Sequence, residues 1–224
     1  MGLLATYPRL SMEWLKHETD PDLGREEIVI AAEAGDLKTG TVLGRITKGD
    51  ASSAAKAGGN TGGGTLTLDV TTPILAGASP GVYKVRCIAS VTDGGEFSVE
   101  DPDGFVIGNV AVGATFADQI KFVLADSGTD FAVGDGFDVT IDDGSAKWVP
   151  CEYGAVDGSG VAAGILLDGR DASGEDDVKG VAVIADARVA AEYLTWDASF
   201  DDANKKAAAL AQLAALNIKT VRAY

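Results

Sequence analysis

The chain has little of what most hydrolases and nucleic-acid-binding proteins depend on. Among its 224 residues there is one histidine, and 18 lysines and arginines stand against 34 acids. A hydrolytic triad needs a histidine base beside a nucleophile, and the single His17 lies in the polar stretch HETDPD. A nucleic-acid binder neutralises phosphates with clustered basic residues, and no such cluster exists at a net charge of −16. We therefore expect no catalytic residue and no nucleic-acid partner.

Long apolar runs are also missing. No stretch approaches the roughly 18 apolar residues that a membrane-spanning helix requires, and the start MGLLATYPRLSMEW lacks the basic region and apolar core of a signal peptide. We expect a protein that is made in the cytoplasm and has no membrane partner. The acidity keeps the molecule soluble and repels nucleic acid.

Cysteine is scarce, and acidic turns lack the spacing of known cation sites. Cys87 and Cys151 follow no metal-binding pattern. A disulfide between them cannot be deduced, and we expect free, partly buried thiols. The acidic turns around Asp101, Asp142 and Asp176 do not place ligands as an EF-hand loop does. We expect no metal and no cofactor.

Glycine, by contrast, is abundant. The 29 glycines fall between short apolar runs, which indicates many tight turns and a mostly β fold. The stretch 48–64 is small, polar and rich in glycine, and we interpret it as a linker. The glycines at 58–64 lack the Lys-Ser/Thr that completes a phosphate-binding loop.

Residues 65–146 contain six short strand-like runs separated by strong turn signals. The run 82–90 alternates with period two, with Tyr83, Val85 and Cys87 on one face and Lys84 and Arg86 on the other. The other runs are 65–70, 96–99, 105–110, 120–125 and 137–141. Their regular spacing predicts a β-sandwich or barrel.

The flanking sequence predicts further strands and one helix. Strand-like runs cover 28–32, 40–47, 161–167, 178–187, 188–194 and 218–224, and 169–177 is a polar loop. The helix is predicted to begin at Ser199, where S-x-x-D resembles a capping box, and to end at Asn217 in a left-handed conformation.

The first 27 residues show no persistent period and are interpreted as an arm. Their apolar side chains include Tyr7, Leu10, Trp14 and Leu15. They either fold back onto the protein's own domain or bind a partner surface, where aromatic residues are favoured.

The composition changes predict a discontinuous organisation. We expect an N-terminal arm at 1–27, a domain formed by 28–57 and 147–224, and an inserted β-domain with its glycine-rich linker at 58–146. The fold class is mostly β or α+β, with one C-terminal helix.

Five segments outside the insert form an ordered set: GTVLGRIT (40–47), KWVP (147–150), AAGILLDGRDASG (162–174), VAVIADARV (181–189) and the terminal helix with NIKTVRA (217–223). This set resembles the head decoration proteins of lambda-like tailed phages. Each is short, but their order and spacing match that family once the insert is removed. The match covers about half of the chain, and the insert resembles a glycine-rich β-module of phage structural proteins.

The resemblance implies a structural virion protein rather than an enzyme. It implies three copies over each threefold axis of the expanded capsid, on its outer surface, with the major capsid protein as partner. It also implies an N-terminal segment that clamps the shell, for which Tyr7, Leu10, Trp14 and Leu15 are the candidate contacts. The alternative is a display or adhesion module whose insert binds a host glycan or surface protein.

Overall fold

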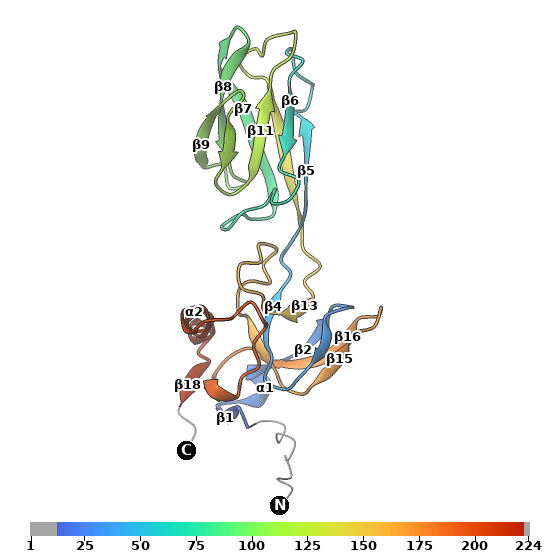
Figure 1. The fold of residues 1–224 in the computed structure, drawn as a ribbon, viewed down its shortest axis with the longest axis vertical. Coiled ribbons are helices and arrows are strands. Elements are labelled where there is room, and N and C mark those ends of the chain that lie inside the picture. The colour runs from blue at the N-terminus through green and yellow to red at the C-terminus, as the bar shows by residue number, and fades with distance from the viewer. Residues whose placement is uncertain (1–12, 222–224) are drawn as a thin grey trace, which may run out of the picture. The chain divides into compact units, whose positions relative to one another are not determined.

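The computed structural model describes residues 13–221, which divide into two compact units (Figure 1). The discontinuous unit comprises Met1–Ile46 and Ala146–Tyr224, and the inserted unit comprises Thr47–Ser145. Each unit has its own sheets and its own core.

A closed five-stranded barrel forms the centre of the discontinuous unit, in the order β13-β2-β16-β14-β4. The strands are β2 (Arg25–Ile30), β4 (Val42–Arg45), β13 (Trp148–Pro150), β14 (Gly164–Leu166) and β16 (Val178–Val183). All neighbours are antiparallel except the parallel pair β13 and β2. A separate antiparallel pair consists of β3 (Gly35–Leu37) and β15 (Arg170–Ala172). In the sequence, β3 lies between the barrel strands β2 and β4, and β15 lies between β14 and β16.

Strand β14 and the first three residues of β4 are buried on both faces, which explains why their sequences are continuous apolar runs rather than alternating ones. Ile165 belongs to one buried cluster and Leu166 to another, and Val42 and Leu43 divide in the same way. Successive side chains of a strand point to opposite faces. The "VLG" and "GILL" segments therefore contribute side chains to two separate cores, one on each face of the strand.

A second layer covers one of these cores. It consists of the strands β1 (Leu15–Glu18), β17 (Ala187–Ala190) and β18 (Lys219–Val221), with β17 in the middle, together with the 3-10 helix η1 (Ala191–Tyr193) and helix α2 (Ala203–Ala215), which lie between β17 and β18 in the sequence. Helix α2 buries Ala209 and Leu213 against the cluster that contains Trp14 and Ile165. The expected strand at 188–194 is shorter than predicted because η1 replaces its second half.

The boundaries of α2 correct one prediction and confirm another. The N-cap is Asp202, whose carboxylate accepts hydrogen bonds from the backbone N–H groups of Asn204 and Lys205. Ser199 is not the cap, and its hydroxyl instead accepts from the N–H of Tyr153. At the other end Asn217 has φ +59°, the predicted left-handed terminator.

The inserted unit is built from two antiparallel sheets. The five-stranded sheet has the order β5-β12-β7-β8-β9 and the three-stranded sheet the order β10-β11-β6. The strands are β5 (Lys48–Ala55), β6 (Thr65–Leu68), β7 (Gly81–Val91), β8 (Gly94–Glu100), β9 (Val106–Ala111), β10 (Thr115–Ala117), β11 (Lys121–Ala125) and β12 (Gly136–Asp143).

The core of this unit contains side chains from both sheets. Tyr83 and Val85 of β7 are fully buried, and Lys84 between them is exposed, as the alternation predicts. The Phe97 ring meets the edge of Phe131 at a centroid distance of 5.0 Å, and Phe116 stacks on Phe122 at 5.2 Å. Such aromatic pairs stabilise a core beyond their buried area.

The linker prediction is wrong for residues 48–55. These residues form the edge strand β5, which pairs with β12 from Ala55–Phe137 to Lys48–Asp143. An edge strand is held by backbone hydrogen bonds and leaves its side chains largely exposed, so small polar residues suffice. The inserted unit accordingly begins at Thr47 rather than at residue 58.

The described part of the predicted arm also differs from the sequence-based expectation. Residues 15–18 form β1, residues 25–30 form β2, and the short helix α1 (Pro21–Gly24) connects them. The Arg25 guanidinium pairs with the Glu18 carboxylate, which fastens the start of β2 to β1 and raises the pKa of Arg25. Similarly, the predicted polar loop at 169–177 contains strand β15.

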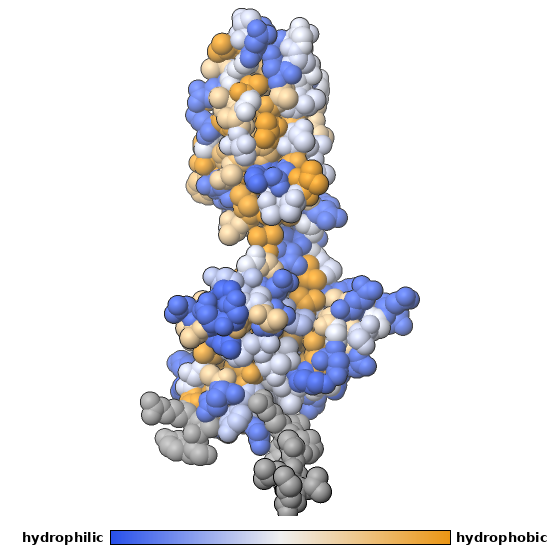
Figure 2. Space-filling view, viewed as in Figure 1, coloured by the Kyte–Doolittle hydropathy of each residue, from blue (hydrophilic) through white to orange (hydrophobic). Residues whose placement is uncertain are grey.

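The mostly β fold with one C-terminal helix is confirmed. Both cysteines are free and buried, Cys151 in the discontinuous unit and Cys87 in the inserted unit. No helix among residues 13–221 is long and apolar enough to cross a membrane. Figure 2 shows that hydrophilic residues gather where β15 and β16 lie. Over the inserted unit, hydrophobic and hydrophilic residues are mixed.

Candidate functional site

Trp14 anchors the point at which the N-terminal segment joins the discontinuous unit. Its side chain is only 2% exposed and belongs to the core cluster beneath α2. The indole Nε1 donates to the Thr39 hydroxyl at 3.0 Å, and that hydroxyl donates to the Leu167 carbonyl at 2.7 Å. The Trp14 carbonyl also accepts from the N–H of Ala190 at 2.7 Å. Trp14 is thus hydrogen-bonded through both its side chain and its backbone, and its ring is buried rather than exposed at the surface.

Two glycines of the GTVLGRIT segment have steric reasons to be glycine. A Cβ on Gly40, whose φ is +78°, would lie 2.8 Å from Cδ1 of Trp14. A Cβ on Gly44 would lie 2.0 Å from the carbonyl oxygen of Ser159. The first glycine makes room for the indole and the second for the 150–163 connection. Sequence reasoning identified the segment but not these contacts.

The structure separates the four predicted contact residues into two groups. Trp14 is buried, and Leu15 is half-buried and packs against the same cluster, so these two residues fold onto the protein's own domain. Tyr7 and Leu10 lie outside the described residues. A partner-binding role for the arm therefore concerns residues 1–12.

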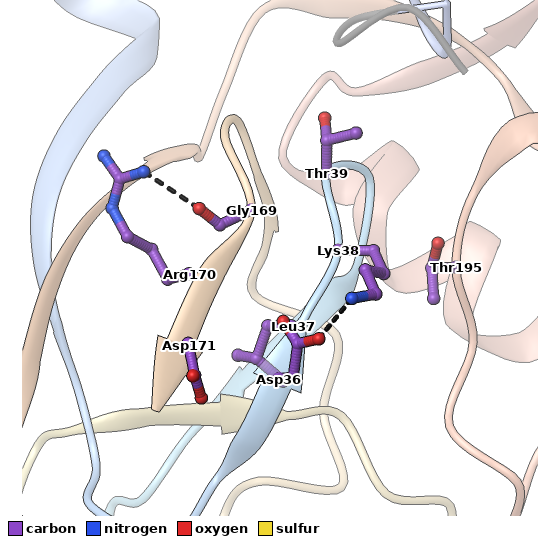
Figure 3. Close-up of a pocket in the computed structure, with 8 residues that line it drawn as sticks. All are labelled: Asp36, Leu37, Lys38, Thr39, Gly169, Arg170, Asp171 and Thr195. Carbon is purple, nitrogen blue, oxygen red and sulfur yellow. Dashed lines mark hydrogen bonds and ion pairs between the residues drawn. The ribbon is translucent and has the colours of Figure 1, made fainter. Parts of the chain in front are cut away.

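A polar hollow of about 600 Å³ lies where β3 and β15 run side by side (Figure 3). Lys38 forms an ion pair with Asp36 on one wall, and Arg170 on the other wall donates to the Gly169 carbonyl at 2.9 Å. The Asp171 carboxylate accepts from the hydroxyl and the N–H of Ser173, which lowers the pKa of Asp171. The charges of this hollow are thus satisfied locally.

An apolar groove of about 490 Å³ opens between the end of α2 and the barrel. Its large exposed apolar side chains are Val161, at 53%, and Leu216, at 37%. The side-chain Oε1 of Gln212 accepts from the backbone N–H of Ala162 at 2.8 Å, which ties one wall to the other. The expected strand at 161–167 is shorter in the structure, where β14 covers Gly164–Leu166 and Val161 is left exposed before it.

In two of the acidic turns singled out in the sequence, a carboxylate accepts a hydrogen bond from a backbone N–H. Asp101 accepts from the N–H of Phe105 at 2.8 Å. Asp177 pairs with Lys147 at 2.7 Å and accepts from the N–H of Ala32, and these contacts lower its pKa. Such local bonds account for the carboxylates without a cation.

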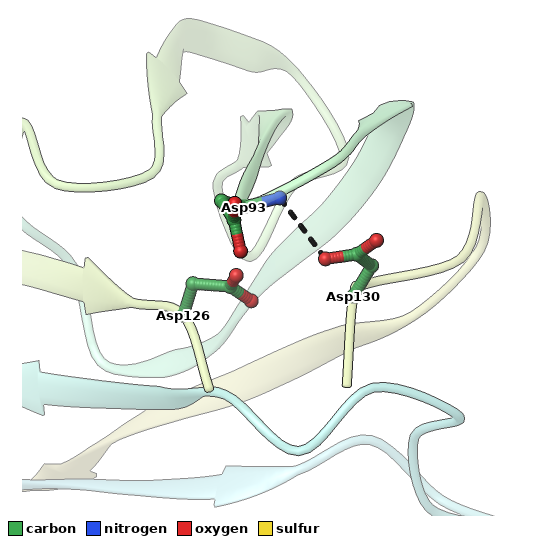
Figure 4. Close-up of side chains that lie close together, drawn as sticks. All are labelled: Asp93, Asp126 and Asp130. Carbon is green, nitrogen blue, oxygen red and sulfur yellow. Dashed lines mark hydrogen bonds between the residues drawn. The ribbon is translucent and has the colours of Figure 1, made fainter. Parts of the chain in front are cut away.

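A different acidic group contains the described residues that could hold a cation. Asp93 from the β7–β8 turn meets Asp126 and Asp130 from the β11–β12 connection, with oxygens within 4.8 Å of one another (Figure 4). Asp130 accepts from the N–H of Asp93 at 3.0 Å. Asp93 and Asp130 are exposed.

His17 and Cys151, the remaining titratable groups of interest in the sequence, form no catalytic arrangement among residues 13–221. His17 is exposed on β1 and lines neither of the two hollows. Burial raises the pKa of the Cys151 thiol to about 12, which keeps it protonated and unreactive near neutral pH.

Three comparisons with known proteins bear on the identity of the chain. The family model described as Bacteriophage lambda head decoration protein D matches residues 5–218. No curated protein matches the chain.

Two crystal structures of Xanthomonas campestris FlgL are similar at 19% and 22% identity, with TM-scores of 0.31 and 0.30. They cover 50% and 46% of this chain, which matches only about a third of their own length, 33% in each case. Likeness at that level carries no argument about function.

The family match includes both segments of the discontinuous unit and the inserted unit between them. It includes the TVLG glycines that accommodate Trp14 and the 150–163 connection, and the strands that form the barrel. The chain therefore belongs to the bacteriophage lambda head decoration protein D family.

Proposed function

We propose that this protein binds the outer surface of the expanded phage capsid at its threefold sites as a homotrimer and stabilises the shell. Its direct partner is the major capsid protein. The observation that carries the proposal is the family match over residues 5–218. The protein is made in the host cytoplasm and performs no catalysis in this role.

The N-terminal segment is the proposed clamp. Residues 1–12 contain Leu3, Leu4, Tyr7 and Leu10 but only one charged side chain, Arg9. Trp14 fixes the point from which this segment starts, because its indole is buried and hydrogen-bonded to Thr39. An apolar segment attached at a fixed, buried residue is suited to bind a neighbouring protein surface.

Stabilisation requires only differential binding. A ligand that binds one state of the shell stabilises that state by RT ln(1 + [L]/Kd) at each site. Summed over many sites, modest contacts offset the outward strain of packaged DNA. The net charge of −16 supports a position outside the shell, because such a surface repels nucleic acid.

Co-sedimentation with capsids that lack the protein tests this proposal. We expect saturable binding to expanded shells, none to unexpanded shells, and at least a tenfold loss of affinity when residues 1–12 are removed. The matched control replaces the exposed Leu23 of α1 by Asp, which leaves 1–12 intact. Trp14 is unsuitable for this test because its loss would destabilise the domain. Equal binding to both shells, or none to either, contradicts the proposal.

The adhesion alternative has less support. The inserted unit contains seven aromatic residues, and Phe105 alone among them is exposed, at 69%. The other six are buried: Tyr83, Phe97, Phe116, Phe122, Phe131 and Phe137. Adhesion would be favoured if substitutions in the turns of the inserted unit abolished adsorption to cells while capsid binding persisted.

A further inference from the structure

Three carboxylates of the inserted unit converge on one point. Asp93 lies in the turn between β7 and β8, and Asp126 and Asp130 lie in the connection between β11 and β12. One oxygen of each lies within 4.8 Å of the others. Figure 4 shows the Asp126 carboxylate pointing toward the space between Asp93 and Asp130. Like charges at this separation repel one another, so the arrangement calls for a positive charge.

The protein itself does not supply that charge. Elsewhere in the same unit, Lys121 pairs with Asp69 at 2.9 Å, and Arg86 pairs with Asp138. Among residues 13–221, no lysine or arginine forms an ion pair with any of the three converging carboxylates.

The second, independent observation concerns a single oxygen atom. Oδ1 of Asp126 is buried and has no hydrogen-bond partner, and it is the one such side-chain oxygen or nitrogen among residues 13–221. Leaving a buried carboxylate oxygen without a donor is costly, and a bound water or ion is the usual explanation. Ionised carboxylates only accept, so Asp93 and Asp130 cannot donate to it. A water would donate but would leave the three charges uncompensated, whereas a cation satisfies both needs.

The ligand type and the spacing fit calcium. Ca²⁺ takes oxygen ligands at about 2.3–2.6 Å, so two ligands on opposite sides of the ion lie about 5 Å apart. Three oxygens within 4.8 Å of one another therefore fit one coordination sphere. Asp93 and Asp130 are exposed, which leaves room for waters to complete the six to eight ligands that calcium takes. Transition metals favour histidine and cysteine ligands, and this group contains neither.

We propose that Asp93, Asp126 and Asp130 form a calcium site that joins the β7–β8 turn to the β11–β12 connection. Spacing along the chain does not reveal such a site, because its ligands come from two separate segments, unlike those of an EF-hand loop. Three carboxylates with an open side correspond to the affinity of extracellular calcium modules, a Kd of about 0.1–1 mM. The site is independent of the proposed function, since both connections belong to the inserted unit.

Isothermal titration calorimetry of the full chain with CaCl₂ tests the proposal. We expect one ion per chain, and weaker binding of MgCl₂, which demands a stricter octahedral geometry. Asp126→Asn keeps the shape of the side chain but removes its charge, and it is expected to weaken calcium binding at least tenfold. Asp103→Asn is the matched control, because it makes the same change in an exposed turn of the same unit and leaves the affinity unchanged.

Thermal unfolding distinguishes the loss of a ligand from misfolding. Calcium at about 10 mM is expected to raise the Tm of the parent chain by roughly 3 °C or more and to leave the Tm of Asp126→Asn unchanged. Without calcium, Asp126→Asn is expected to be at least as stable as the parent chain, because it relieves the repulsion. Asp93→Asn provides a second variant, since asparagine tolerates the φ of +56° at this position.

Three results would overturn the proposal. The first is calcium binding of equal strength in the parent chain, Asp126→Asn and Asp93→Asn. The second is weak binding of several ions per chain, which the net charge of −16 would produce without a site. The third is a parent Tm that does not respond to calcium. Capsid binding enters none of these measurements, so failure of the proposed function leaves the test intact.

Discussion

Asp135 organises the glycine-rich stretch that precedes β6. Its carboxylate is 4% exposed and accepts from the N–H groups of Thr61, Gly62 and Ala132, each at 2.9 Å. Burial by itself would raise the pKa of Asp135, but these three donors outweigh it and hold the pKa below its usual range. Residues 60–64 form no helix or strand, and the buried Asp135 carboxylate instead binds the backbone N–H groups of Thr61 and Gly62.

The sign of the pH effect follows from this depressed pKa. A carboxyl whose pKa is lower in the folded state stabilises the protein above its unfolded pKa of about 3.9, and this contribution is lost as the pH falls through the folded value. We expect Asp135→Asn to cost roughly 2–4 kcal/mol at pH 7. Chemical denaturation from pH 7 to pH 2 should show the difference from the parent chain shrinking below about pH 4. A difference that does not change with pH would contradict this account.

Gly44 provides a steric prediction at the same scale. A Cβ at this position would lie 2.0 Å from the Ser159 oxygen, so Gly44→Ala must displace backbone. We expect a loss of roughly 1–3 kcal/mol or more in the free energy of unfolding. Gly128→Ala is the matched control, because nothing lies within 4 Å of its Cβ. Thermal unfolding of both variants checks the prediction, which fails if they are equally stable.

The element scale is represented by the start of α2. Asp202 caps the helix through Asn204 at 2.7 Å and Lys205 at 2.9 Å, and we expect Asp202→Ala to cost about 1 kcal/mol. Asp201 is its neighbour and makes only an exposed ion pair with Lys205. Asp201→Ala should therefore change stability by less than about 0.5 kcal/mol. Thermal denaturation followed by circular dichroism distinguishes the two, and equal effects would indicate a different cap.

Elements differ in how readily the sequence predicts them. The six runs in 65–141 were recognised as strands because alternation and turn residues are local signals. The edge strand β5 was not, because KGDASSAA has neither apolar alternation nor β-branched residues. Its pairing with β12 depends on a partner more than 80 residues away. Short strands such as β3 and β15 were missed for the same reason.

At the scale of the whole molecule, the two segments of the discontinuous unit pair with each other at the point where the inserted unit begins and ends. The Ile46 N–H donates to the Lys147 carbonyl at 2.9 Å, and β4 pairs with β13 through Arg45 and Trp148. This geometry suits a two-residue hairpin turn. We expect a chain in which Asn-Gly replaces residues 47–146 to fold cooperatively and to retain capsid binding.

Calorimetry and co-sedimentation of this shortened chain provide the measurement. One cooperative transition and an affinity within about threefold of the parent chain are the expected results. An unfolded product would mean that the inserted unit contributes to the stability of the barrel. A folded product that no longer binds expanded shells would place capsid contacts within 47–146.

The sequence by itself determined the mostly β class, the C-terminal helix with its Asn217 terminator, and the ordered segments of the decoration family, because these depend on neighbours within a few residues. Tertiary structure alone decided the place of Trp14. Its burial depends on Gly40, Thr39 and Leu167, which are distant in the chain. An aromatic residue in an aperiodic segment is equally compatible with a core and an interface until those partners are brought together.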